Sequence, residues 1–237
     1  SGWMQDSVGW WYKNEDGSYP KETWKLIDGA WYYFNASGYR VSNWQSIDGK
    51  WYYFDVVTGV MAANAWVDNN QSYVSDSGVM VTGWQVINGA DYFFNSSGVV
   101  VKNQWVGDYY LDEDGKMLTN AWAGVYHVGA DGTYQKGWLK LDEGWYYLGT
   151  SGVVQTGWIQ IGKEWYYGNP ESENPGLLVE NDWMTLGNAR YHFYAGGAMA
   201  ISWTLIDGDY YYFNESGAMV TSAWVGNYYL NEDGVMA

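Results

Sequence analysis

Cysteine is absent from the 237 residues, and the chain has only 3 prolines and 2 histidines. Without cysteine there can be no disulfide bonds and no thiolate zinc site. The absence does not indicate the cellular compartment of the protein. Long apolar runs are also missing. None approaches the roughly 18 residues that span a bilayer, so we expect no membrane insertion.

Basic residues are few: 11 Lys and Arg stand against 27 Asp and Glu, for a formal net charge of −16. Such a surface repels phosphate backbones and attracts cations, so we expect no nucleic acid partner and favour a small cationic ligand. The chain starts at Ser1 without a basic and apolar leader, and residues 224–237 read as one more repeat. We therefore expect a mature or excised piece.

Aromatic residues are abundant, with 18 Trp and 24 Tyr beside 31 Gly. One tryptophan recurs about every 20 residues, which is typical of repeat architectures. These leading tryptophans are Trp3, Trp24, Trp44, Trp66, Trp84, Trp105, Trp122, Trp138, Trp158, Trp183, Trp203 and Trp224.

Each repeat has the pattern of a β-hairpin. Residues 24–27 form a first strand, Asp28 and Gly29 a tight turn, and residues 31–34 a return strand of aromatic strand formers. Because a lone hairpin is marginal in water, each must bury its rings on the next. The sequence predicts an all-β solenoid of about twelve stacked β-hairpin repeats of roughly 20 residues.

The whole chain, 1–237, is predicted to be a single repeat array. Its consensus-like units cover 1–65 and 138–168, and degenerate or abbreviated units cover 66–137 and 183–237. The units that begin at Trp105, Trp122 and Trp224 lack part of the first strand. An insertion over residues 169–175 predicts a surface loop, with a bend or boundary in the array.

Several repeats carry a known signature. The segments Thr82-Gly83-Trp84, Thr156-Gly157-Trp158 and Gly217-Ala218-Met219, together with residues 31–34, resemble the choline-binding (cell-wall-binding) repeats of pneumococcal surface proteins, autolysins and phage lysins. The resemblance spans essentially the whole chain. It implies a left-handed β-solenoid in which choline lies between consecutive hairpins, caged by two tryptophans of one unit and a tyrosine of the next.

Aromatic cages suit this ligand, because a quaternary ammonium makes no conventional hydrogen bond and is recognised by ring faces. Strand alternation places Trp31 and Tyr33 on one face and Tyr32 and Phe34 on the other. Carried over unit by unit, the resemblance implies five cages: Trp3, Trp10 and Tyr33; Trp24, Trp31 and Tyr53; Trp44, Trp51 and Tyr73; Trp138, Trp145 and Tyr167; Trp203, Tyr210 and Tyr229.

Other units depart from the cage pattern. Gln71, Asp91 and Arg190 stand where the second tryptophan is expected. His192 stands where a tyrosine is expected beside the tryptophans of the preceding unit, and the Arg190 cation should disfavour a second cation. We therefore expect few functional sites, concentrated at the N-terminal end and over residues 138–167.

Catalytic and metal sites find little support. The acidic turns at residues 14–17, 112–115 and 231–234 lack the spacing of an EF-hand, so we expect solvated turns and no metal site. His127 and His192 occupy positions where other units have tyrosine, with no nucleophile motif nearby. We expect no enzyme activity and no cofactor.

The leading hypothesis is a non-catalytic module that anchors a protein to choline or phosphocholine of cell-wall teichoic acids. It would be secreted to the cell wall or surface of a Gram-positive bacterium, or belong to a phage lysin, with a homodimer possible through terminal hairpins. One alternative is a module that binds glucan or another wall polysaccharide by ring stacking. Another is an adhesin or inhibitor surface for a protein partner over about 66–137.

Overall fold

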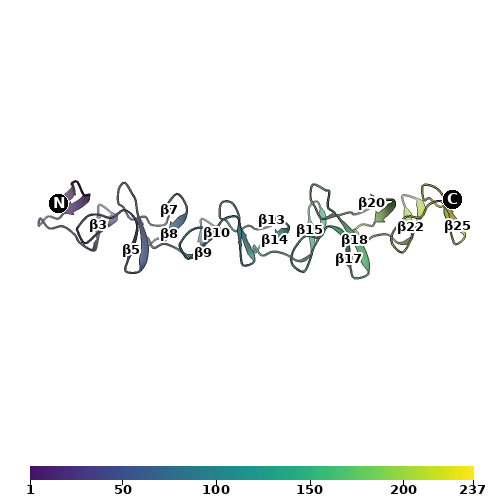
Figure 1. Ribbon diagram of the computed structural model, residues 1–237, viewed down its shortest axis with the longest axis horizontal. Helices are drawn as coiled ribbons and strands as arrows, with labels where there is room; N and C mark the ends of the chain where they lie inside the picture. The colour runs from purple at the N-terminus through teal and green to yellow at the C-terminus, as the bar shows by residue number, and fades with distance from the viewer. The chain divides into compact units, whose positions relative to one another are not determined.

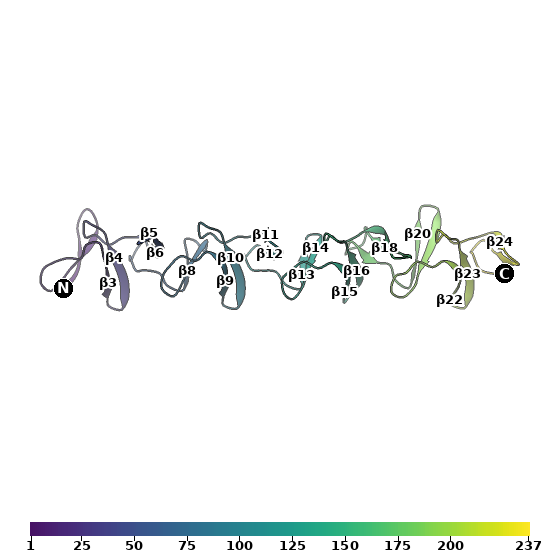
Figure 2. The ribbon, with the colours of Figure 1, turned by 90° about the horizontal axis from the view of Figure 1, so that it is seen from below.

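The computed structural model describes residues 1–237 and contains β-strands without helices. It therefore has no helix long and apolar enough to cross a membrane. The chain divides into two compact units, Ser1–Leu118 and Thr119–Ala237. Within each unit, two-stranded hairpins follow one another in sequence order (Figures 1 and 2). A single array over the whole chain stays a prediction.

The first unit holds twelve strands. They are β1 (Gly2–Gln5), β2 (Trp10–Lys13), β3 (Thr23–Ile27), β4 (Ala30–Phe34), β5 (Asn43–Ile47), β6 (Lys50–Phe54), β7 (Ala65–Val67), β8 (Ser72–Val74), β9 (Gly83–Ile87), β10 (Ala90–Phe94), β11 (Gln104–Val106) and β12 (Tyr109–Leu111).

The second unit holds the remaining thirteen. They are β13 (Ala121–Ala123), β14 (Tyr126–Val128), β15 (Gly137–Leu141), β16 (Gly144–Leu148), β17 (Gly157–Ile161), β18 (Glu164–Asn169), β19 (Leu177–Leu178), β20 (Asp182–Leu186), β21 (Ala189–Phe193), β22 (Ser202–Ile206), β23 (Asp209–Phe213), β24 (Ala223–Val225) and β25 (Tyr228–Leu230). Only β19 joins an existing hairpin, as a third strand beside β18.

The β3–β4 hairpin shows how a repeat folds. Asp28 (φ 49°) and Gly29 (φ 82°) both have positive φ, which matches the twist of a two-residue hairpin turn. Antiparallel pairing then sets Trp24 opposite Tyr33. Opposite residues share a face, so Trp24, Trp31 and Tyr33 project to the same side. The predicted all-β hairpin repeat fold is confirmed.

The core lies between hairpins as a ladder of rings. Trp24 of β3 meets Tyr52 and Phe54 of the next hairpin, with ring centroids 4.9 and 5.6 Å away. Phe34, Phe54, Phe94, Phe193 and Phe213, which end their return strands, are fully buried. Burying such a side chain contributes about 2–3 kcal/mol. Each unit is therefore held together by contacts between neighbouring repeats.

One backbone hydrogen bond recurs between repeats. After β6 the chain returns, and the Met61 N–H donates to the Trp31 carbonyl of the preceding hairpin at 2.8 Å. We call the residue that donates this N–H the clasp residue of the hairpin whose carbonyl accepts it. Gly78 packs over Met61, where an added Cβ would lie 2.7 Å from the sulfur, and its φ of 81° favours glycine. The bond and the glycine fix the Met61 side chain beside Trp31.

The irregular repeats have the short strands and the inserted loop that the sequence predicts. The units at Trp105, Trp122 and Trp224 have strands of three residues, as their missing segments predict. The inserted residues Pro170, Glu171 and Pro175 are exposed between β18 and β19, which confirms the surface loop.

Candidate functional site

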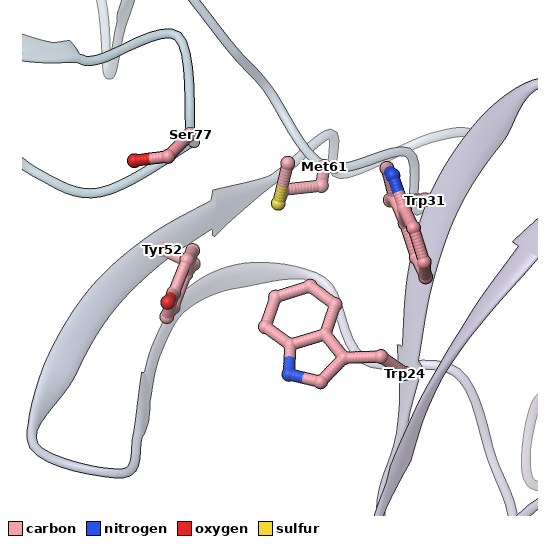
Figure 3. Close-up of a pocket in the computed structure, with 5 residues that line it drawn as sticks. All are labelled: Trp24, Trp31, Tyr52, Met61 and Ser77. Atoms are coloured by element: carbon pink, nitrogen blue, oxygen red, sulfur yellow. The ribbon is translucent and has the colours of Figure 1, made fainter.

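A pocket of about 330 Å³ lies between the β3–β4 and β5–β6 hairpins. Its walls are the indoles of Trp24 and Trp31, the ring of Tyr52 and the clasp residue Met61, which surround a common space (Figure 3). Ser77, from the turn of the following repeat, lies at its edge. The volume falls at the lower end of the range of small-molecule sites, roughly 300–1,000 Å³. We call this arrangement the second cage.

The third ring of the second cage is Tyr52, where the sequence predicted Tyr53. Tyr53 lies opposite Trp44 in its own hairpin, at 5.2 Å between ring centroids. The reason is strand alternation: the face that meets the preceding hairpin carries Tyr52 and the buried Phe54, while Tyr53 is on the opposite face. The predicted tyrosine was therefore one residue too late.

The same one-residue correction applies to three other predicted cages. The tyrosines that face the preceding tryptophan are Tyr32 at 4.8 Å from Trp3, Tyr166 at 5.0 Å from Trp138 and Tyr228 at 5.5 Å from Trp203. The predicted Tyr33, Tyr167 and Tyr229 pack instead on Trp24, Trp158 and Trp224 of their own hairpins, at 5.2, 5.3 and 5.4 Å.

The first predicted cage is filled by the chain itself. Arg40 is its clasp residue, and its N–H donates to the Trp10 carbonyl at 2.8 Å. The Arg40 Cζ lies 5.9 Å from the centroid of Trp3 and 5.8 Å from that of Trp10. Burial lowers the pKa of Arg40, yet a guanidinium stays charged in proteins. A cation therefore already occupies the space beside these two indoles.

The third predicted cage is wider and more polar. Trp44, Trp51 and the clasp residue Met80 line a pocket of about 500 Å³. The position equivalent to Tyr52 is Ser72, because the predicted Tyr73 lies opposite Trp66 and its hydroxyl donates to Asn64. The pocket also includes Asp68, whose carboxylate accepts the Trp44 indole N–H at 3.4 Å.

The fourth and fifth predicted cages keep the two predicted rings that come from a single hairpin. Trp138 and Trp145 lie 5.8 Å apart between centroids, and the Lys140 ammonium lies 5.3 Å from Trp145. Trp203 and Tyr210 share one face of the β22–β23 hairpin. Met236 is the clasp residue there and donates to the Tyr210 carbonyl at 2.9 Å.

The sequence reasoning missed one cage. Trp158 and Trp165 line a pocket of about 350 Å³ with Tyr191 and the clasp residue Met199. The predicted obstacle, His192, lies opposite Trp183 in its own hairpin, whereas Tyr191 faces Trp158 at 4.9 Å. Applying strand alternation to β21 would have found this site.

Three departures from the cage pattern remain. The Arg190 Cζ lies 4.2 Å from the centroid of Trp183, so that indole too is paired with a cation of the chain. Trp66 and Trp84 keep a tyrosine of the next repeat at 5.1 and 5.3 Å. Gln71 and Asp91 stand in place of their second indole, so each of these units offers one tryptophan.

The two histidines have different surroundings. His127 Nδ1 is hydrogen-bonded to the Gln135 side chain at 2.8 Å. His192 is buried, which lowers its pKa, and its Nδ1 has no partner. No group of three or more His, Cys, Asp or Glu side chains is placed to hold a metal ion.

Family comparisons match most of the chain. Two profiles, both described as a choline-binding repeat, match residues 22–66 and 181–224, and residues 99–134. A third, described as a cell wall binding repeat, matches residues 82–100, 136–154, 156–169 and 226–236. No curated protein sequence gives a significant match.

Solved structures from Streptococcus pneumoniae share the fold. The modular autolysin LytC, solved with a synthetic peptidoglycan ligand, is 28% identical with a TM-score of 0.66 over 93% of this chain and 52% of LytC. The chain thus spans about half of LytC. CbpJ is 25% identical with a TM-score of 0.59, over 99% of each chain.

Choline binding protein F, solved in the presence of a peptidoglycan analogue, is 26% identical with a TM-score of 0.57. The match covers 100% of this chain and 98% of that protein. Repeats of this kind are in general non-catalytic binding modules. With the hairpin fold, the ring pockets and the three profile matches in agreement, the chain belongs to the choline-binding repeat family and is a cell-wall-binding module.

Proposed function

We propose that this chain binds the choline residues of cell-wall teichoic acids in aromatic cages between consecutive hairpins, without catalysis, and so holds a protein at the surface of a Gram-positive bacterium. The observation that carries the proposal is the second cage. Trp24, Trp31 and Tyr52 surround one space, and no charged side chain of the protein lines it. Such a space suits a cation that offers methyl groups and no hydrogen-bond donor.

The charge of the chain supports the same ligand. The net charge of −16 raises the local concentration of cations near the surface. Each cage is shallow, so we expect a dissociation constant on the order of millimolar for free choline. A polymer that repeats its ligand engages several cages at once and gains avidity through effective concentration. The open sites are the second cage, the Trp44 and Trp51 pocket and the Trp158 and Trp165 pocket.

Choline titration tests the proposal. The expected result is a saturable change in tryptophan fluorescence and elution of the protein from an immobilised-choline resin by free choline. Trp24→Ala and Trp158→Ala should each remove one site. Val57→Ala changes an exposed loop residue outside the cages and serves as a matched control.

Two other outcomes would redirect the assignment. If neutral dextran retards the protein and choline does not compete, a wall polysaccharide would be favoured as the ligand. A protein partner retained in saturating choline would favour an adhesin or inhibitor surface. Neither result is expected from a cage that selects a quaternary ammonium.

A further inference from the structure

At the N-terminal end, neighbouring residues project into two different pockets. Trp10 and Arg40 belong to the first cage. Their chain neighbours Trp11 and Tyr39 line a separate pocket of about 230 Å³ with Asp6, Tyr19 and Ser37. This is expected where side chains alternate along an extended chain. We call it the Trp11 pocket, and it lies outside the five predicted cages and the added Trp158 cage.

The Trp11 pocket is itself an aromatic enclosure. The rings of Trp11 and Tyr19 lie 5.8 Å apart at 66°, and Tyr39 adds a third ring. Gly38 (φ 83°) makes room, because a Cβ there would lie 2.5 Å from the Tyr19 ring. Ring faces at this spacing attract an ammonium ion, and the Lys21 ammonium already lies 4.8 Å from the Tyr19 centroid without lining the pocket.

A fixed carboxylate distinguishes this pocket from the second cage. Asp6 Oδ1 accepts the Val8 and Gly9 N–H groups at 2.8 and 3.2 Å, and Oδ2 accepts the Tyr39 hydroxyl at 3.0 Å. The bond from Val8, followed by those from Gly9 and Tyr39, lowers the pKa of Asp6, so the group is ionised at neutral pH. A carboxylate offers about four lone-pair sites, and three are used. Oδ2 receives one hydrogen bond from the protein, which leaves a second acceptor position there for a ligand.

We propose that the Trp11 pocket binds an alkylammonium ion that still carries an N–H, such as a protonated tertiary amine. The rings receive the alkyl groups, and the free acceptor position of Asp6 receives the N–H. A quaternary ammonium has no N–H to donate to that acceptor and is bound less tightly. The proposal is independent of choline binding in the cages, because no side chain is shared between the two kinds of site.

A matched pair of probes tests it: choline and N,N-dimethylethanolamine differ by one methyl group. Each is titrated into the full chain while the indole N–H resonances are followed by NMR, with Trp11 assigned from Trp11→Phe. We expect the Trp11 resonance to report about threefold tighter binding of the tertiary amine. The factor is modest because Asp6 is exposed and water screens its charge. Repeating the titration with Nα-acetyl-lysine methylamide distinguishes a lysine side chain from a small amine as the source.

Two variants make the result decisive. Asp6→Asn should abolish the preference between the two probes. Tyr19→Leu removes a ring without touching the Asp6 hydrogen bonds and should weaken both probes about fivefold. The proposal is overturned if the Trp11 resonance responds to neither probe, or if Asp6→Asn keeps the preference. A Trp11 response to the amine without any choline response at Trp24 and Trp31 would reject the choline cages and leave this pocket standing.

Discussion

The first and second cages of the first unit have the same construction and opposite occupancy. Each takes two tryptophans from one hairpin, a tyrosine from the next and a clasp residue bonded at 2.8 Å to the second tryptophan. Arg40 is the clasp residue in the first cage, and its guanidinium lies 5.9 and 5.8 Å from the centroids of the two indoles. Met61 is the clasp residue in the second and leaves about 330 Å³. A single side chain therefore decides whether the space beside the two indoles is filled or open.

Converting the open cage to the filled form should have the largest effect. In Met61→Arg, the new guanidinium would occupy the second cage and repel a second cation. We expect choline binding at Trp24 and Trp31 to fall at least about tenfold, measured by the shifts of their indole resonances. Met61→Leu is the matched control and should retain binding. Undiminished binding in Met61→Arg would mean that the clasp residue does not control occupancy.

The reverse change, Arg40→Met, should open the first cage. Calorimetry is expected to show one additional choline site of millimolar affinity. Without ligand, the variant should be destabilised by about 1 kcal/mol in urea unfolding, since it loses cation–π contacts and the hydrogen bond to the Val57 carbonyl. An unchanged number of sites would contradict the assignment of Arg40 as the occupant.

Tyrosine substitutions sharpen the comparison within one hairpin. Tyr52→Ala removes a wall of the second cage and should weaken choline binding there about fivefold. Tyr53→Ala removes the partner of Trp44 and should leave the second cage within about twofold of its original affinity. The Trp31 indole resonance reports both effects. The opposite order would restore Tyr53 as the third ring.

The smallest expected effect is a difference between the two units in how their stability depends on pH. Both histidines lie in the second unit, and burial lowers the pKa of His192. Because the pKa of His192 is lower in the folded chain, the unfolded chain binds more protons once the pH falls below about 6.5. The free energy of unfolding should therefore fall as the pH drops below that value. Between about pH 6.5 and 5, amide protection of β21 should fall relative to β4. His192→Tyr, the residue that other repeats carry, should remove the difference.

The hairpins were predictable because each carries its own signals. Asp28 and Gly29 specify the turn, and the apolar and aromatic strand residues specify the pairing, all within one repeat. The cages were only partly predictable, because their walls come from different repeats. Alternation decides whether Tyr52 or Tyr53 faces the preceding hairpin, and the sequence interpretation noted that alternation without applying it across the interface.

The filling of the first cage was not visible in the spacing of tryptophans. Arg40 stands where Met61, Met80 and Met199 stand in other repeats, but its significance depends on the backbone bond that directs the side chain toward Trp10. The wide third pocket depends likewise on a shortened strand that places Ser72 at the tyrosine position. The filled first cage and the wide third pocket both depend on how one repeat aligns with the next. The sequence of a single repeat does not encode that alignment.

The second cage draws Trp24 and Trp31 from one repeat, Tyr52 and Met61 from the next and Ser77 from a third. A ligand bound there would therefore contact three consecutive repeats. Because such a ligand would bind only the stacked form, it would also stabilise the stacking of those repeats.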